Sequence, residues 1–346
     1  MPRNASTNAR QSSKSKHMEP YFATDRLKIY HGDCRDVLTQ LPDESVQTVV
    51  TSPPYYGLRD YQVDGQIGLE QTPDEYVTSM VEVFREVRRV LREDGTLWLN
   101  MGDSYCGSPR GNKNGWEGSG LHGVESAKYQ ETLNAGTAKT IDKTKIPGLK
   151  PKDLIGIPWR LALALQADGW WLRQDIIWHK NNPMPESVTD RCTKAHEYIF
   201  LMTRAAKYYY DAEAIKEPAE VRLDADGTRH RGNARELTKE QTGRTDGFTR
   251  CPENSGRDGT RNKRSVWTVN TAPYKGAHFA TFPPKLIDPC IKAGCPEGGT
   301  VLDPFHGSGT TGQVALNHSC NYIGIELNED YIKLSLQRFK QGRLKW

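Results

Sequence analysis

The stretch that decides the fold is Val301-Leu302-Asp303-Pro304-Phe305-His306-Gly307-Ser308-Gly309-Thr310-Thr311. It predicts a short buried strand, then a glycine turn, then the start of a helix. Glycines let the backbone approach a ligand closely, and the free N–H groups of a helix start suit a carboxylate or a phosphate. Roughly 20 residues later, Tyr322-Ile323-Gly324-Ile325-Glu326 predicts a second strand that ends in an acid, the position from which dinucleotide-binding folds hold ribose hydroxyls.

A second motif, Thr51-Ser52-Pro53-Pro54-Tyr55, follows the apolar run 46–50. The two prolines carry no N–H, so the Pro53 carbonyl is left as a hydrogen-bond acceptor. Ser52 adds a second oxygen, and Tyr55 offers a ring face for stacking. Such a turn is suited to binding a planar amino group. Taken alone, it is equally typical of a polyproline-like turn after a strand.

Together the two motifs resemble the amino-group DNA methyltransferases that use S-adenosylmethionine, in the permuted order in which Ser-Pro-Pro-Tyr precedes the cofactor loop. The resemblance covers most of residues 30–331. The segment 278–283 is similar to the one that packs on the methionine portion of the cofactor, and 32–34 to the motif that contacts the adenine. The cofactor-binding residues that the resemblance implies are Asp33, Phe279, Thr281, Asp303, Phe305, Gly307, Gly309, Thr310, Thr311 and Glu326.

The resemblance also implies the reaction. Ser-Pro-Pro-Tyr, in contrast to Asp-Pro-Pro-Tyr or Asn-Pro-Pro-Tyr, is typical of cytosine-N4 enzymes, so we expect methylation of the exocyclic N4 amine of a cytosine flipped out of double-stranded DNA. Ser52, Pro53, Pro54 and Tyr55 are then the catalytic residues. A serine in this turn need not exclude adenine, so adenine-N6 methylation stays an alternative. A cognate restriction endonuclease is a candidate partner.

Two further regions are expected to face DNA. Residues 178–185 resemble the family segment that meets the extruded base, which implicates Trp178, Lys180 and Asn182. The family places target recognition between the catalytic motif and the cofactor loop, and region 212–266 there is rich in arginine, whose forks suit guanine edges and phosphates. We expect DNA contacts from Arg244, Arg250 and Arg261. Interspersed acids leave a solvated loop as the alternative.

The element pattern predicts an α/β fold, doubly wound around a mostly parallel sheet (a Rossmann-like methyltransferase fold) with inserted target-recognition loops. The clearest helix runs from Pro73 to about Arg92, because Thr72 and Glu75 form a capping box and Gly95 ends it. Other expected helices are 34–41 and 155–167, and expected strands are 27–30, 45–50, 96–100, 171–178 and 197–203. The predicted parts are a disordered tail at 1–20, a catalytic core at 21–105, 151–211 and 267–346, an inserted loop region at 106–150, and a DNA target-recognition region at 212–266.

Composition restricts the function only loosely. Lys plus Arg number 47 against 43 acids in 346 residues, so the net charge of +4 permits nucleic-acid binding without proving it. Seven cysteines without a Cys-x-x-Cys pair predict neither a disulfide framework nor a metal site, and zinc at Cys290 and Cys295 is a minor alternative. Without a long apolar run or a secretory signal, we expect a cytoplasmic protein that does not contact a membrane.

Other enzyme classes fit the motifs less well. Carbon-5 methylation uses a Pro-Cys dipeptide followed by Gln, whereas Pro289-Cys290 is followed by Ile291. A phosphate-binding P-loop requires a lysine, and none follows Gly309. A catalytically silent DNA-binding module remains a distant alternative, opposed by the intact motifs. His306 is expected to pack or cap rather than to act as a base.

Overall fold

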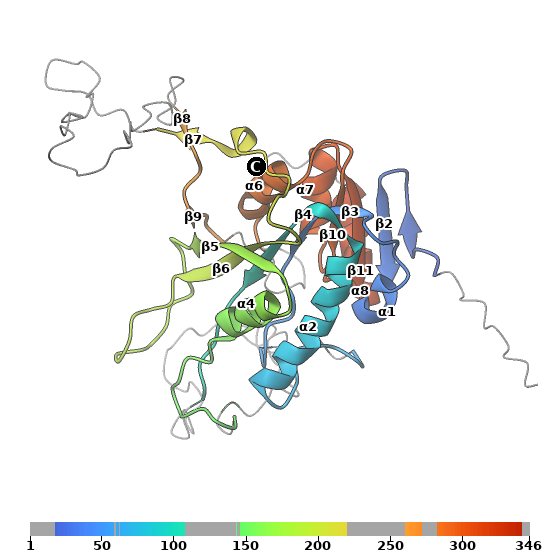
Figure 1. The fold of residues 1–346 in the computed structure, drawn as a ribbon. Coiled ribbons are helices and arrows are strands. Elements are labelled where there is room, and N and C mark those ends of the chain that lie inside the picture. The colour runs from blue at the N-terminus through green and yellow to red at the C-terminus, as the bar shows by residue number, and fades with distance from the viewer. Residues whose placement is uncertain are drawn as a thin grey trace, which may run out of the picture.

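The computed structural model describes residues 18–58, 60–61, 63–107, 143, 146–219, 260–271 and 282–340. Its centre is a nine-stranded sheet in the order β1-β2-β11-β10-β3-β4-β6-β5-β9, shown in Figure 1. Strands β2, β11, β10, β3 and β4 are parallel to one another, and β5 is parallel to β9. Strand β1 pairs antiparallel with β2, and β6 pairs antiparallel with both β4 and β5. The strands are β1 (Phe22–Ala23), β2 (Leu27–His31), β3 (Val46–Thr51), β4 (Leu91–Met101), β5 (Trp171–His179), β6 (His196–Thr203), β9 (Val266–Thr268), β10 (Thr300–Asp303) and β11 (Asn321–Glu326).

Helices cover both faces of this sheet. On one face lie α1 (Cys34–Leu38), α2 (Pro73–Val90) and α4 (Ile157–Ala167), whose apolar residues share one core. On the other face lie α6 (Pro284–Gly294), α7 (Thr310–Asn317) and α8 (Glu329–Lys340), which share a second core. The predicted doubly wound, mostly parallel α/β architecture is confirmed. Among the described residues, no helix is both long and apolar enough to cross a membrane.

Helix α2 begins where the sequence predicts but ends earlier. The Thr72 hydroxyl accepts a hydrogen bond from the Glu75 N–H at 3.2 Å, and the Glu75 carboxylate accepts one from the Thr72 N–H at 3.1 Å. The helix ends at Val90, and the chain continues directly into β4 at Leu91 with extended backbone angles. The expected stop at Gly95 was wrong. Gly95 lies inside the strand, where a Cβ would come within 2.6 Å of the Leu91 side chain.

At two places, described residues on either side of an undescribed stretch are joined by backbone hydrogen bonds. At the first, the Cys106 N–H donates to the Asp153 carbonyl at 2.8 Å, and the Gly107 N–H donates to the Lys143 carbonyl at 3.0 Å. At the second, after the 3₁₀ turn η1 (Glu213–Ile215), strand β7 (Glu217–Pro218) pairs antiparallel with β8 (Thr260–Arg261). Cys106, Gly107 and Lys143 lie within the predicted insertion 106–150 and Asp153 just beyond it, and β7 and β8 lie within the predicted insertion 212–266. The predicted tail lies almost entirely outside the described residues.

The parallel strands bring several turns to one edge of the sheet. The carboxyl ends of β2, β11, β10, β3 and β4 all lie there, so the segments that follow them become neighbours. The connection after β3 leads to α2 on one face, whereas the connection after β10 leads to α7 on the other. Ligands of open α/β sheets bind outside the carboxyl ends at such a switch point.

Candidate active site

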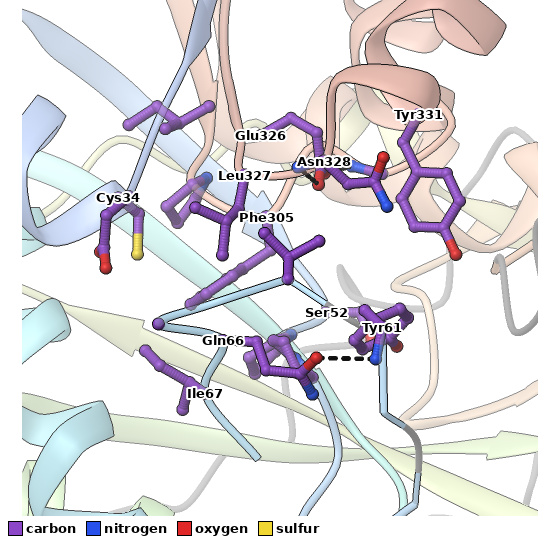
Figure 2. Close-up of a pocket in the computed structure, with 18 of the residues that line it drawn as sticks. Cys34, Ser52, Tyr61, Gln66, Ile67, Phe305, Glu326, Leu327, Asn328 and Tyr331 are labelled. Carbon is purple, nitrogen blue, oxygen red and sulfur yellow. Dashed lines mark hydrogen bonds between the residues drawn. The ribbon is translucent and has the colours of Figure 1, made fainter. Parts of the chain in front are cut away.

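A pocket lies at this switch point, between the turn after β3 and the turn after β10. Ser52 and Gln66 lie on one side of it, and Glu326, Leu327 and Asn328 on the other (Figure 2). The pocket is lined by Gly32, Asp33, Cys34, Ser52, Pro53, Pro54, Tyr55, Leu58, Tyr61, Val63, Gly65, Gln66, Ile67, Pro304, Phe305, Gly307, Ile325, Glu326, Leu327, Asn328 and Tyr331. The two motifs that are far apart in the sequence therefore share one cavity.

The turn after β3 presents hydrogen-bond acceptors. The Tyr76 hydroxyl of α2 donates to the Pro54 carbonyl at 2.8 Å, which fixes the far end of the turn. Among the residues that the structure describes, no donor reaches the Pro53 carbonyl. The Ser52 hydroxyl donates to the Tyr55 hydroxyl oxygen at 3.4 Å, so the lone pairs of Ser52 Oγ are left for an incoming N–H.

Tyr55 is held at its ring and at its hydroxyl. Gly102, just after β4, lies so close that a Cβ there would be 2.5 Å from Tyr55 Cε2. The Tyr55 hydroxyl donates to Glu197 Oε2 at 2.8 Å and lies 3.3 Å from Asn100 Oδ1. Burial, reinforced by the charge of Glu197, raises the pKa of Tyr55 well above its ordinary value. Tyr55 therefore stays a neutral phenol that donates its proton.

Asp303 connects the two turns. Its Oδ1 accepts from the Thr51 hydroxyl at 2.7 Å and from the Phe305 N–H at 3.1 Å, and its Oδ2 accepts from the Thr311 hydroxyl at 2.8 Å. Burial raises the pKa of Asp303 to about 6, although these hydrogen bonds act in the opposite direction. Because Thr51 directly precedes Ser52, Asp303 fixes the acceptor turn relative to the glycine loop.

The glycine loop is shaped by left-handed backbone and by Glu326. Gly307 has φ of 53° and Gly309 has φ of 80°, angles that favour glycine. Glu326 Oε2 accepts from the Gly307 N–H at 2.7 Å, and Oε1 accepts from the Asn328 N–H at 2.8 Å. Burial raises the pKa of Glu326 to about 7. Glu326 therefore both lines the pocket and supports the loop.

Helix α8 supports the same loop from behind. Arg338 donates to the Ser308 carbonyl at 3.2 Å and to the Thr310 hydroxyl at 2.6 Å. The buried ring of His306 lies between the Tyr322 hydroxyl and the Ser335 hydroxyl, at 2.7 and 2.8 Å. This position agrees with the packing role expected for His306.

The chain matches known proteins over nearly its whole length. The N6/N4 methyltransferase family model, described as DNA methylase, matches residues 46–337. The Type II methyltransferase M.Cfr9I of Citrobacter freundii is 42% identical over 340 residues, 98% of this chain and 96% of that protein. M.SmaI of Serratia marcescens, also a Type II methyltransferase, is 45% identical over 317 residues, 91% of each chain.

The chain belongs to the N6/N4 DNA methylase family. Within it, the chain groups with Type II methyltransferases, and it is a DNA amino-methyltransferase that uses S-adenosylmethionine. The fold also matches solved structures. The PvuII cytosine-N4-specific DNA methyltransferase has a TM-score of 0.60 at 18% identity, covering 94% of this chain and 91% of that one. A Thermus thermophilus protein described as a putative DNA modification methylase, solved with S-adenosyl-L-methionine, has a TM-score of 0.54 at 21% identity, covering 93% and 96%.

Most of the residues predicted to bind the cofactor lie at this pocket, in two layers. Asp33, Phe305, Gly307 and Glu326 line the pocket itself. Asp33 also caps α1 through the Arg35 N–H at 2.8 Å and pairs with the Arg35 guanidinium, and hydrogen bonds from Arg35 lower the pKa of Asp33 against the effect of burial. Behind this layer, without lining the pocket, lie Asp303, Gly309, Thr310 and Thr311. Phe279 and Thr281 lie outside the described residues.

The residues predicted to contact DNA are engaged within the protein. Trp178 is 4% exposed and donates its indole N–H to the Val269 carbonyl at 2.7 Å, so its ring does not line the pocket. Lys180 pairs with Glu197. Asn182 exchanges hydrogen bonds with the Thr271 backbone. Arg261 donates to Glu217 at 2.9 Å. Arg244 and Arg250 lie outside the described residues, and DNA contact by this group stays a prediction.

Asn100, Glu197 and the aromatic pair at the pocket edge were not predicted from the sequence. Tyr61 and Tyr331 meet edge-on there, with ring centroids 6.2 Å apart. A signal existed for Asn100, since it is a polar residue near the end of a buried strand. Glu197 lies at the start of β6, and only the antiparallel pairing of β6 with β4 brings it to the same edge.

Proposed function

We propose that this protein methylates the exocyclic N4 amine of cytosine at a specific site in double-stranded DNA. The observation that carries the proposal is the shared pocket, in which Ser52 and Pro53, the residues that carry the acceptors, line a cavity also lined by Gly307 and Glu326. What supports cytosine over adenine is Ser52, because serine at this position of the turn is the form typical of cytosine-N4 enzymes. Adenine-N6 methylation is the second candidate.

The residues favour the transition state over the bound substrate. An exocyclic amine is a poor nucleophile, because its lone pair is delocalised into the ring. Ser52 Oγ and the Pro53 carbonyl accept the two amino hydrogens and favour the pyramidal nitrogen that attacks, which is selective stabilisation of the transition state. S-adenosylmethionine supplies an electrophilic methyl group on a sulfonium. With the cofactor bound, the nitrogen would gain the methyl group as the sulfur–carbon bond breaks, and the acidic methylated ammonium would then lose its proton to water without a strong base.

The remaining pocket residues orient the reactants. We assign the ribose hydroxyls to Glu326 and the adenine moiety of the cofactor to Asp33, and the position of both residues in the pocket lining supports this. Tyr55 lies beside the acceptors, where its ring can stack on a base turned out of the duplex. Asp303, through Thr51 and Thr311, holds the two halves at a fixed distance, and alignment of two reactants supplies much of a rate enhancement.

The inserted segments are the proposed source of DNA specificity. The described residues at their borders are joined by backbone hydrogen bonds, at Cys106 with Asp153 and at β7 with β8. Loops on a rigid scaffold are the usual carriers of recognition. We assign target recognition chiefly to 212–266, with 106–150 contributing, and a cognate restriction endonuclease as the biological partner.

The deciding experiment identifies the methylated nucleoside. The protein is incubated with duplex DNA and isotopically labelled S-adenosylmethionine, and the DNA is digested to nucleosides for mass spectrometry. Labelled N4-methylcytosine is expected. Labelled N6-methyladenine would establish the second candidate instead, and labelled 5-methylcytosine would overturn the mechanism.

A further inference from the structure

Behind the acceptor turn lies a chain of polar contacts that leads from Ser52 to a buried ion pair. It starts at Ser52, whose hydroxyl donates to the Tyr55 hydroxyl oxygen at 3.4 Å. It continues through the Tyr55 hydroxyl, which donates to Glu197 Oε2 at 2.8 Å. It ends at Lys180, whose ammonium pairs with Glu197 Oε1. A charged group thus terminates a hydrogen-bond chain that begins at the expected acceptor.

Glu197 is fixed in place by three partners. Its Oε2 also lies 3.3 Å from Asn100 Nδ2, and the same amide donates to the Tyr198 carbonyl at 3.0 Å. Lys180 lies 4.2 Å from the centroid of the Trp178 ring, a cation–π contact that holds the ammonium against the carboxylate. Both side chains of the ion pair are mostly buried, with 16% of Glu197 and 18% of Lys180 exposed. The carboxylate therefore has little freedom to turn away from Tyr55.

We propose that Glu197 is a positioning residue that orients the Ser52 hydroxyl as a hydrogen-bond acceptor for the target amine. This inference rests on the proposed function. An ionised carboxylate only accepts hydrogen bonds, so Tyr55 must donate its single proton to Glu197. The Tyr55 oxygen then accepts from Ser52, and the Ser52 proton points away from the pocket. The lone pairs of Ser52 Oγ are left facing the amine.

A neutral amide at position 197 would no longer fix the direction in which Ser52 and Tyr55 donate their hydroxyl protons. Glutamine can either accept from Tyr55 or donate to it. When it donates, the Tyr55 proton turns toward Ser52 or toward Asn100 Oδ1, which lies 3.3 Å away. In the first case the Ser52 proton is free to point at the amine, where two donors oppose each other. Glu197→Gln therefore keeps the size of the side chain and removes the fixed direction of the chain.

The test is a double-mutant cycle between positions 197 and 55. Glu197→Gln, Tyr55→Phe and the double variant are compared with the wild-type protein in single-turnover methylation of duplex DNA at saturating S-adenosylmethionine. Each single variant is expected to lower the rate about 10- to 100-fold, the range for a lost hydrogen bond to a charged group. The double variant is expected to match Tyr55→Phe within about two-fold, because Glu197 acts through Tyr55. The cofactor dissociation constant should stay within about two-fold of wild type.

Asp168→Asn is the matched control. Asp168 is also 16% exposed and pairs with a basic side chain, Arg85, but the pair joins α2 to the end of α4. It is expected to leave the methylation rate unchanged. Tyr55→Phe keeps the Glu197–Lys180 pair. Its methylation rate therefore tests the hydrogen-bond chain if Glu197→Gln melts at a markedly lower temperature.

The result that would overturn the inference is multiplicative losses in the double variant, or a wild-type rate in folded Glu197→Gln. Failure of the proposed function is separate, since it would appear as the absence of methylated cytosine with the wild-type protein in the same assay.

Discussion

The Thr51 hydroxyl and the Asp303 carboxylate lie 2.7 Å apart, although 252 positions separate them in the chain. Thr51 ends β3 directly before the acceptor turn, and Asp303 ends β10 directly before the glycine loop. Both groups are buried. This hydrogen bond therefore ties the acceptor turn to the glycine loop.

Removing that hydrogen bond should weaken both folding and catalysis. Thr51→Val keeps the side-chain shape and deprives a buried carboxylate of one donor, a change that costs about 1–3 kcal/mol of unfolding free energy. Urea unfolding measures the loss, and the methylation rate should fall with it. Thr78→Val is the control, because the Thr78 hydroxyl donates to the Asp74 carbonyl on the exposed side of α2. Equal stability of Thr51→Val and wild type would contradict the assigned link.

Ser52→Ala should reduce turnover far more than cofactor affinity. The change removes one of two acceptors for the amine and leaves the Pro53 carbonyl, so a loss on the order of 100-fold in kcat is expected. Steady-state kinetics and calorimetric titration with S-adenosylmethionine separate the two effects. Ser45→Ala, before the start of β3, is the control. Equal losses of kcat and cofactor affinity would mean that Ser52 has another role.

Glu326→Ala should weaken cofactor binding first. The change removes the carboxylate that lines the pocket and also the acceptor for the Gly307 N–H. An increase of about ten-fold or more in the cofactor dissociation constant is expected. Glu329→Ala, on the exposed start of α8, should leave that constant unchanged. An unchanged constant for Glu326→Ala would refute the ribose assignment.

Stability should depend on pH through Glu326. Burial raises the pKa of Glu326 from 4.5 to about 7, with the nearby Asp303 charge adding to the rise and N–H groups of Gly307, Leu327 and Asn328 opposing it. Protonated Glu326 therefore adds to the free energy of unfolding. This stabilisation, on the order of 3 kcal/mol, is fully present below pH 4.5 and is lost as the pH rises through about 7.

Glu326→Gln should lack this dependence. The difference in unfolding free energy between wild type and this variant, measured without cofactor, should therefore fall across that pH window. A difference that does not vary with pH would show that Glu326 titrates normally in the folded protein.

Gly102→Ala should disturb Tyr55. A Cβ at position 102 would lie 2.5 Å from Tyr55 Cε2, so the ring must move or the strand end must shift. Overpacking of this kind costs about 1–3 kcal/mol of stability. The methylation rate is expected to fall about ten-fold or more, because misplacements of about 1 Å in an active site have large effects. A crystal structure of the variant with Tyr55 unmoved and a wild-type rate would contradict this prediction.

The sequence predicted the fold well because its signals are local. The capping box at Thr72 and the strand, turn and helix at 300–317 each follow from neighbouring residues, and the structure contains them. The end of α2 was missed because Leu91 continues the apolar stripe of the helix, whereas pairing with β3 draws it into β4. Short strands such as β9 depend on a partner strand and carry almost no local signal.

The site was predictable only in part, for the same reason. Gly307, Glu326 and Ser52 follow from motifs that are continuous in the sequence. Glu197 does not, since its place beside Tyr55 depends on an antiparallel pairing across the sheet. Trp178 shows the converse limit. The sequence predicts that it contacts the extruded base, which stays a prediction. In the structure its indole N–H donates to the Val269 carbonyl, directly after β9, and its ring contacts Lys180.

The position of β10 between β3 and β11 has a consequence for synthesis on the ribosome. Asp303 is added 252 residues after Thr51, which at ordinary translation rates is a delay of roughly 10 to 50 s. During that time β3, a fully buried strand in the finished protein, has one edge without its permanent neighbour. A nascent chain must therefore shield that edge, and it cannot modify DNA until the late strand has inserted.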